Sequence, residues 1–271
     1  MSKVLVVTSG KGGVGKTTTT AALGAALAMM GQKVVLVDFD VGLRNLDLIM
    51  GAERRVVFDL IHVIQGDANL SQTLIKDKRV EGLFLLPTSQ TRDKDALTQE
   101  GVSRVIDELR GKFDWVLCDS PAGIEHGAQM AMYHADKAVI VVNPEVSSIR
   151  DSDRIIGMLN STTQKAKESG EIEKFLLITR YNPQRVGRGD MLTTDDVLDI
   201  LSIPLLGVVP ESQDILVSSN VGAPVTVSKP KSVAASAYSE AARRLMGEDV
   251  QVTIPTERRG LLEWLFKRKA I

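Results

Sequence analysis

The sequence contains little that would point to a disulfide-rich, membrane-spanning or strongly charged protein. Its single cysteine, Cys118, cannot form an intramolecular disulfide and lies in an apolar run typical of a buried thiol. No apolar run approaches the roughly 20 residues that span a membrane, and no signal peptide precedes the first apolar run. Lys and Arg (33) almost equal Asp and Glu (34), which argues against bulk binding to nucleic acid. We therefore expect a cytoplasmic protein.

What the chain does contain is an alternation of short apolar runs and helix-like segments. Strands that are apolar throughout are typical of a parallel sheet covered on both faces. We therefore predict an α/β fold with a mostly parallel, doubly wound sheet flanked by helices and with ligands at the carboxyl ends of the strands. The predicted strands are residues 4–7, 34–37, 83–86, 115–117, 138–142, 175–179 and 205–209.

The length of 271 residues and the 44% hydrophobic content suit one large core. Near the end of the chain the composition changes around Pro255, where polar residues separate the last core helix from a distinct tail. We predict a core domain over residues 1–247, a linker over 248–257 and a tail over 258–271.

The segment GKGGVGKT, residues 10–17, is a complete P-loop. It lies between a predicted strand and a predicted helix over residues 18–30, and this context favours a phosphate site over a chance glycine-rich turn. Lys16 is expected to reach the β- and γ-phosphates of a nucleotide, and the Thr17 hydroxyl to bind Mg²⁺. The remaining residues predicted to surround the phosphates are Gly10, Lys11, Gly12, Gly13, Val14, Gly15 and Thr18.

Carboxylates follow two other predicted strands. Asp38 and Asp40, one residue apart, can both face a metal-bound phosphate, although a helix N-cap or a turn would also explain them. The segment 115–123 has the form of a Walker B motif followed by a switch. Asp119 would hold Mg²⁺ through water, and the Gly123 N–H could sense the γ-phosphate.

Base recognition is expected from loops that follow later strands. Arg180 and Asn182 follow one of these strands, and Pro210 and Glu211 follow another. The chain has no Asn-Lys-x-Asp motif, and this absence weakens the case for guanine. The Asn182-Pro183 step would also suit a plain turn.

The tail predicts a short, basic amphipathic helix. Five Lys or Arg and two Glu lie between residues 256 and 271. Such a helix suits the membrane interface, while docking on the chain's own core or in a partner's groove is the alternative. The residues predicted to meet the membrane are Leu261, Leu262, Trp264, Leu265, Phe266 and Lys267.

The P-loop with its early lysine, Lys11, resembles the deviant Walker A (SIMIBI-type) P-loop NTPases of the MinD/ParA family. The resemblance extends to the segments DFDVGLRNLDLIMG, CDSPAGIE, NPEVSSIRDSDR and TRYNP and to the tail. It implies that Lys11 crosses a dimer interface to the partner's ATP, where a solvated surface charge is the alternative. It also implies that Asp40 orients the attacking water, that Asp38 supports the Mg²⁺ shell, and that Asn182 and Pro210-Glu211 surround adenine.

The same resemblance implies partners. Residues 143–154 would face the partner subunit and regulatory proteins, with Asp151 as a candidate ion-pair partner for Lys11 in the nucleotide-free or ADP state. A solvated, charge-rich helix start is the alternative. Arg44 and Asn45 are either partner-facing switch residues or ordinary loop surface. The family members cycle on and off the anionic inner membrane, recruit a MinC-type division inhibitor and are released when a MinE-type protein stimulates ATP hydrolysis. A homodimer with ATP and Mg²⁺, reversibly attached to the cytoplasmic side of the inner membrane, is therefore expected.

Other members of the group predict different functions. A ParA-like DNA-partition ATPase would need a basic surface for duplex DNA, which the charge pattern outside the tail does not supply. A flagellar-number type of positioning ATPase shares the catalytic residues and differs in its partner. An iron–sulfur protein of this fold needs more than one cysteine per subunit, and the chain has only Cys118. No specific binding to nucleic acid is expected.

Overall fold

The computed structural model describes residues 1–256. The six tail residues expected at the membrane, from Leu261 to Lys267, lie outside the described part. Within residues 1–256, no helix is both long and apolar enough to cross a membrane.

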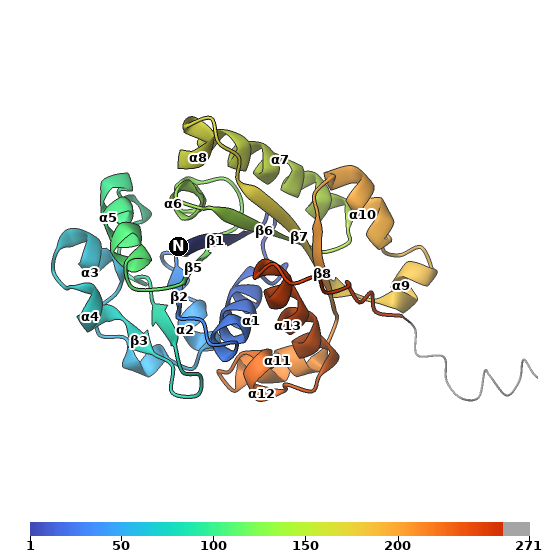
Figure 1. The fold of residues 1–271 in the computed structure, drawn as a ribbon, viewed down its shortest axis with the longest axis horizontal. Helices are drawn as coiled ribbons and strands as arrows, with labels where there is room; N and C mark the ends of the chain where they lie inside the picture. The colour runs from blue at the N-terminus through green and yellow to red at the C-terminus, as the bar shows by residue number, and fades with distance from the viewer. Residues whose placement is uncertain (257–271) are drawn as a thin grey trace, which may run out of the picture.

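One sheet of eight strands organises the described residues, in the order β3-β4-β2-β5-β1-β6-β7-β8 (Figure 1). All neighbouring strands are parallel except β3 and β4, which are antiparallel. The predicted fold class, a mostly parallel sheet flanked by helices, is confirmed. The strands are β1 (Lys3–Thr8), β2 (Val34–Asp38), β3 (Ile75–Lys76), β4 (Leu83–Leu86), β5 (Trp115–Asp119), β6 (Lys137–Val142), β7 (Glu173–Tyr181) and β8 (Leu205–Pro210).

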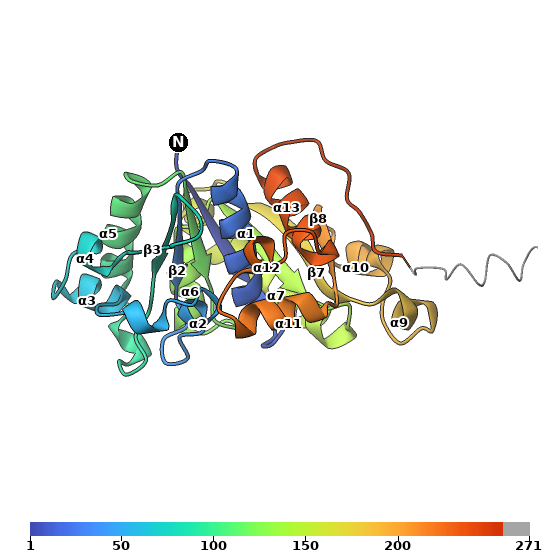
Figure 2. The ribbon, with the colours of Figure 1, turned by 90° about the horizontal axis from the view of Figure 1, so that it is seen from below.

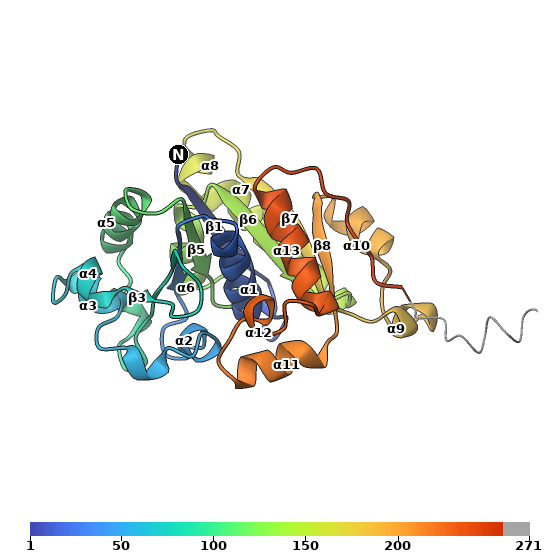
Figure 3. The same ribbon diagram turned by 60° about the horizontal axis from the view of Figure 1, so that its bottom comes forward.

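Helices cover both faces of the sheet, with α6 and α7 on one side and α1 and α13 on the other (Figure 1). Figure 3 shows α1 and α13 side by side across the middle of the sheet. The helices are α1 (Lys16–Met29), α2 (Leu46–Ile49), α3 (Leu60–Gln65), α4 (Leu70–Thr73), α5 (Gln99–Arg110), α6 (His126–Tyr133), α7 (Val146–Thr162), α8 (Gln164–Lys167), α9 (Pro183–Gly187), α10 (Thr194–Leu201), α11 (Gln213–Asn220), α12 (Val225–Ser228) and α13 (Val233–Leu245).

The three central strands β2, β5 and β1 end at nearly the same level. In the pairing of β2 with β5, Asp38 lies opposite Asp119, and Asp119 in turn lies opposite Val7 of β1. All five residues of β2 and of β5 are buried, as expected for strands covered on both faces. The register therefore brings both strand-end carboxylates beside the loop that follows β1.

The last described segment crosses the edge strand β8. Arg244 of α13 donates hydrogen bonds to the Leu206 carbonyl of β8 and to the Val250 carbonyl, each at 2.6 Å. Figure 2 shows the segment leaving α13 and running past β8 toward α9 and α10. These contacts fix the course of the chain as far as Val250.

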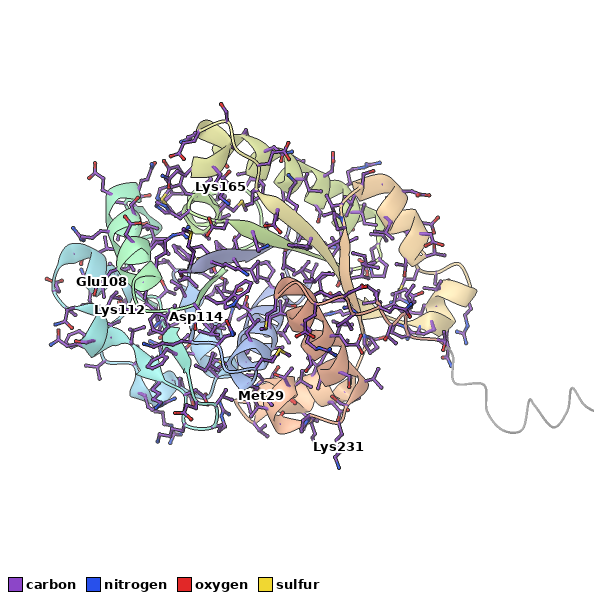
Figure 4. The ribbon with its side chains drawn as sticks, in the orientation of Figure 1. Met29, Glu108, Lys112, Asp114, Lys165 and Lys231 are labelled. Carbon is purple, nitrogen blue, oxygen red and sulfur yellow. The ribbon has the colours of Figure 1, made fainter. Side chains whose placement is uncertain are left out.

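Charged side chains on the outer helices make ordinary surface pairs. Glu108 lies in the last turn of α5 and Lys112 just after the helix ends, and 2.6 Å separates Oε1 from Nζ; both residues are labelled in Figure 4. Both side chains are nearly half exposed, so the pair contributes little to stability. Lys112 can therefore serve as a control residue when charged residues of the site are substituted.

Candidate nucleotide-binding site

The P-loop lies between the end of β1 and the start of α1. Gly13 and Gly15 have φ values of 75° and 99°, a region that residues with a side chain rarely adopt. No side chain caps the start of α1, which leaves backbone N–H groups at this helix end for a ligand. The loop lines a cavity of about 610 Å³, whose P-loop residues are Gly12, Gly13, Gly15, Lys16, Thr17 and Thr18.

Lys16 is buried at the base of this loop. Its Nζ donates to the Ser9 hydroxyl at 3.0 Å and lies 3.5 Å from the Lys11 carbonyl oxygen. Burial lowers the pKa of Lys16, while the negative charges of Asp119 and Asp40 oppose this effect. A buried ammonium group whose nearest partners are neutral oxygens suits a phosphate, since an anion would compensate its charge.

Lys11 contacts the region just before α7. Its Nζ is 3.3 Å from Glu145 Oε2 and 3.1 Å from the Ser147 hydroxyl. The prediction that Asp151 pairs with Lys11 is therefore wrong in this structure. Asp151 lies further along α7, and its backbone packs so closely on Gly10 that a Cβ there would be 2.3 Å from it. Glu145, the residue that precedes α7, accepts the hydrogen bond from Lys11 instead.

Three aspartates gather where β2 and β5 end. Asp38 Oδ1 accepts the Asp40 N–H at 2.8 Å, and Asp38 Oδ2 lies 3.4 Å from the Leu46 nitrogen. Asp119 Oδ1 accepts the Thr20 hydroxyl at 3.0 Å. Asp38 and Asp119 are buried, whereas Asp40 lines the cavity. Asp38 accepts a hydrogen bond from the backbone of the loop that follows β2, as the turn alternative predicted. It also lies opposite Asp119, so a turn alone does not account for its position.

Burial and the charge of a neighbouring carboxylate raise the pKa of both buried aspartates. Burial, followed by the charge of Asp119, raises the pKa of Asp38 well above its ordinary value. Burial raises the pKa of Asp119 to about 7, against hydrogen bonds from Thr17 and Thr20. A hard cation beside Thr17 and Asp119 would offset this charge, which fits Mg²⁺.

Residues 1–256 contain no group of three or more His, Cys, Asp or Glu side chains placed to hold a metal alone. The few protein oxygens near Thr17 still fit Mg²⁺, because this ion keeps several waters and takes further ligands from substrate phosphates.

A second cavity, of about 540 Å³, adjoins the first. Arg180 lines both cavities and has a φ of 52°, an uncommon value for a residue with a side chain. Pro210 and Glu211 also line the second cavity, as expected for base recognition. Asn182 contacts one of these lining residues, because its Nδ2 donates to Glu211 Oε2 at 3.2 Å. Its Oδ1 caps α9. Asn182 therefore has a local structural role, as the turn alternative predicted, and it also contacts Glu211, which lines the second cavity.

Three further predicted residues lie on the loops that follow β2 and β5. Asn45 lines it, and Arg44 forms an ion pair with Asp47 at 2.7 Å. Gly123 has a φ of 85°, and its N–H donates to the Ser9 carbonyl at 3.1 Å. The N–H expected to sense a phosphate is therefore bonded to the residue before the P-loop here.

Comparisons with known proteins agree with this geometry. The model of the AAA domain family matches residues 2–172. The septum site-determining protein MinD of Neisseria meningitidis is 57% identical over 98% of this chain and 99% of its own length. The chain belongs to the MinD family. The MinD/ParA resemblance is thereby confirmed, and the chain is a P-loop ATPase of the septum site-determining type.

Solved MinD structures share the fold closely. A chain of the MinC:MinD cell division complex of Aquifex aeolicus superposes with a TM-score of 0.82 at 43% identity, covering 94% of this chain and all of its own. MinD of Pyrococcus horikoshii, solved with Mg-ADP, has a TM-score of 0.79 at 31% identity, covering 92% and 100%.

Sequence reasoning missed several residues of this MinD-family site. Ser9, Thr20 and Thr179 donate or accept hydrogen bonds within it, and Glu145 and Ser147 hold Lys11. The run of four threonines, residues 17–20, carried a signal, because Thr20 lies one helical turn after Lys16. Ser9 directly precedes Gly10 of the P-loop, whereas Glu145, Ser147 and Thr179 are distant in the sequence and had no local signal.

Proposed function

We propose that this protein hydrolyses ATP with Mg²⁺, dimerises when ATP binds, and helps to position the cell-division site from the membrane surface. The observation that carries the proposal is the buried Lys16 at the P-loop beside the strand-end carboxylates Asp38 and Asp119. The Mg-ADP bound to the Pyrococcus horikoshii relative supports the same nucleotide and metal here.

The protein groups divide the chemistry among them. The P-loop N–H groups and Lys16 would bind the phosphates. Thr17 and, through water, Asp119 would hold Mg²⁺, which would supply neutralisation of the phosphate charge. Asp40 orients the attacking water. Asp38 fixes Asp40 by accepting its backbone N–H and supports the same water network. Positioning and charge stabilisation are what phosphoryl transfer requires from a protein.

Selection of adenine falls to the second cavity. Arg180, Pro210 and Glu211 line it, and Asn182 orients Glu211 through its amide. Without an Asn-Lys-x-Asp motif, the chain lacks the usual guanine reader. We therefore propose ATP as the substrate.

Dimerisation would use the face around the phosphate cavity. Lys11 leaves Glu145 and reaches the nucleotide of the partner subunit, while Gly123 N–H exchanges the Ser9 carbonyl for the γ-phosphate. Arg44, Asn45 and Asp151 would contact the partner subunit or regulatory proteins.

Membrane attachment is assigned to the tail, residues 258–271, joined to the core domain 1–247 by the linker 248–257. One short basic helix binds anionic lipid weakly, but two in a dimer bind far more strongly because the second insertion is intramolecular. A MinC-type inhibitor would be recruited by the dimer, and the MinC:MinD complex of Aquifex aeolicus supports such a partner. A MinE-type protein would stimulate hydrolysis and release.

Two substitutions test the catalytic proposal. Lys16→Ala should abolish ATP binding in calorimetry. Asp40→Ala should keep binding while turnover falls by at least about a hundredfold, because it removes the group that orients the water. Lys112→Ala removes a surface lysine and serves as the matched control. Unchanged turnover in Asp40→Ala would move the water-orienting role elsewhere, and normal binding by Lys16→Ala would refute the nucleotide site.

A further inference from the structure

The side-chain hydroxyl of Thr179, in β7, contacts the P-loop. The residue is 4% exposed, and its Oγ1 is 2.7 Å from the carbonyl oxygen of Val14. The same Oγ1 lies 3.0 Å from Asn143 Oδ1 and 3.3 Å from the Val142 carbonyl oxygen, both at the end of β6. Three oxygens therefore surround one hydroxyl group.

A hydroxyl has one proton, so it can donate fully to one of these oxygens. The shortest contact is with the Val14 carbonyl oxygen, so the hydroxyl donates its proton there. The structure has Asn143 Oδ1 facing this hydroxyl, and the opposite assignment of the amide oxygen and nitrogen would let Nδ2 donate to Thr179 Oγ1. With that assignment, one directed chain of hydrogen bonds runs from Asn143 to Thr179 to Val14.

The P-loop needs such a donor at Val14. When the N–H groups of a loop turn inward to a phosphate, its carbonyl groups turn outward and must find donors elsewhere. Val14 is completely buried, so solvent does not supply one. Gly13 and Gly15 on either side have positive φ and allow the loop many other conformations once the carbonyl is released.

We propose that Thr179 is a positioning residue that holds the P-loop in its phosphate-binding shape, and that Asn143 orients Thr179. The inference rests on the proposed nucleotide-binding function. It also places two connections between the P-loop and the start of α7. Glu145 and Ser147 hold Lys11 on the exposed side, and Asn143 acts through Thr179 on the buried side. When Lys11 moves to a partner's nucleotide, the buried connection keeps the loop in place.

The test compares Thr179→Val, which removes the hydroxyl at nearly constant shape, with Thr179→Ser, which keeps it. Calorimetry should show ATP and ADP affinity about tenfold weaker in the valine variant and within about twofold of wild type in the serine variant. Thr226→Val is the matched control, because it removes an equally buried hydroxyl that bonds to the Ala22 carbonyl at 3.3 Å. Its thermal stability should fall in the same way while its nucleotide affinity stays at the wild-type value.

Thr179 also lines the second cavity, so a loss of affinity in Thr179→Val could come from the P-loop or from a lost contact with the base. The ratio of ATP to GTP affinity distinguishes these two causes. The ratio should be unchanged in Thr179→Val, and a changed ratio would overturn the proposal in favour of base contact. Wild-type ADP affinity in Thr179→Val, or an equal loss in Thr179→Ser, would also overturn it. If the valine variant does not fold, Asn143→Ala replaces it, with a loss of several-fold expected and no loss contradicting the proposal. A wild-type chain that fails to bind ATP would refute the proposed function instead.

Discussion

The contact between Lys11 and Glu145 predicts how much ATP-dependent dimerisation gains when this ion pair is removed. Under the proposed function, Lys11 leaves Glu145 to reach the partner's nucleotide, so the ion pair opposes dimerisation. Glu145→Gln keeps the size of the side chain and removes its charge. The substitution should therefore strengthen the dimer.

The magnitude follows from the exposure of the pair. The two side chains are each 41% exposed, and Nζ and Oε2 are 3.3 Å apart. An exposed pair of this kind contributes about 0.2–1 kcal/mol. A dimer breaks two such pairs, which gives about 0.4–2 kcal/mol, or roughly a 2- to 30-fold tighter dimer.

The assay is sedimentation equilibrium in Mg-ATP, with both proteins carrying Asp40→Ala to slow hydrolysis. Glu248→Gln is the control, because Glu248 pairs with Arg243 at similar exposure, 43% and 48%, on another part of the surface. This control should leave the dimer constant unchanged. A dimer that Glu145→Gln weakens would refute the reasoning, since Glu145 would then contribute to the dimer rather than restrain Lys11.

Three further predictions concern single side chains. Thr20→Val removes the hydroxyl that orients the β5 carboxylate, so turnover should need about tenfold more Mg²⁺; an unchanged Mg²⁺ titration would contradict this. Burial acts to raise the pKa of Asp136, but hydrogen bonding and charge from Arg110 outweigh it and hold the pKa below its ordinary value. Asp136→Asn should therefore cost about 1–3 kcal/mol in urea unfolding at pH 7, a difference that disappears as pH falls through the folded-state pKa; a pH-independent difference would contradict this. Gly10→Ala should abolish ATP binding, because its Cβ would lie 2.3 Å from the α7 backbone, whereas Gly157→Ala meets open space and should leave binding intact.

Most of the sheet could be predicted because its strands are short apolar runs without a polar face. Val34–Asp38 and Leu83–Leu86 have this pattern, and the sequence places them almost to the residue. β3 could not be predicted, because two residues have no periodicity of their own. It is held by tertiary contacts, including the Arg55 guanidinium, which donates to the Lys76 carbonyl at 2.7 Å.

The site residues also fall into two groups, those that a local motif predicts and those that only the tertiary fold brings to the site. The phosphate-binding residues are contiguous, so Lys16 and Thr17 could be assigned from the motif alone. Glu145 and Thr179 reach the loop because β6 and β7 follow β1 in the sheet, an order that no local pattern reveals. The mistaken pairing of Lys11 with Asp151 has the same origin, since which residue near the start of α7 meets the lysine depends on how that helix packs on Gly10.

Sedimentation with anionic liposomes in Mg-ATP, in Mg-ADP and without nucleotide tests the central claim most directly. The account predicts that the protein pellets with liposomes only in Mg-ATP, since dimerisation brings two tails together. Leu262→Glu should abolish pelleting while leaving ATP binding intact. Pelleting that is independent of nucleotide, or no pelleting in Mg-ATP, would contradict the coupling of the P-loop to the membrane.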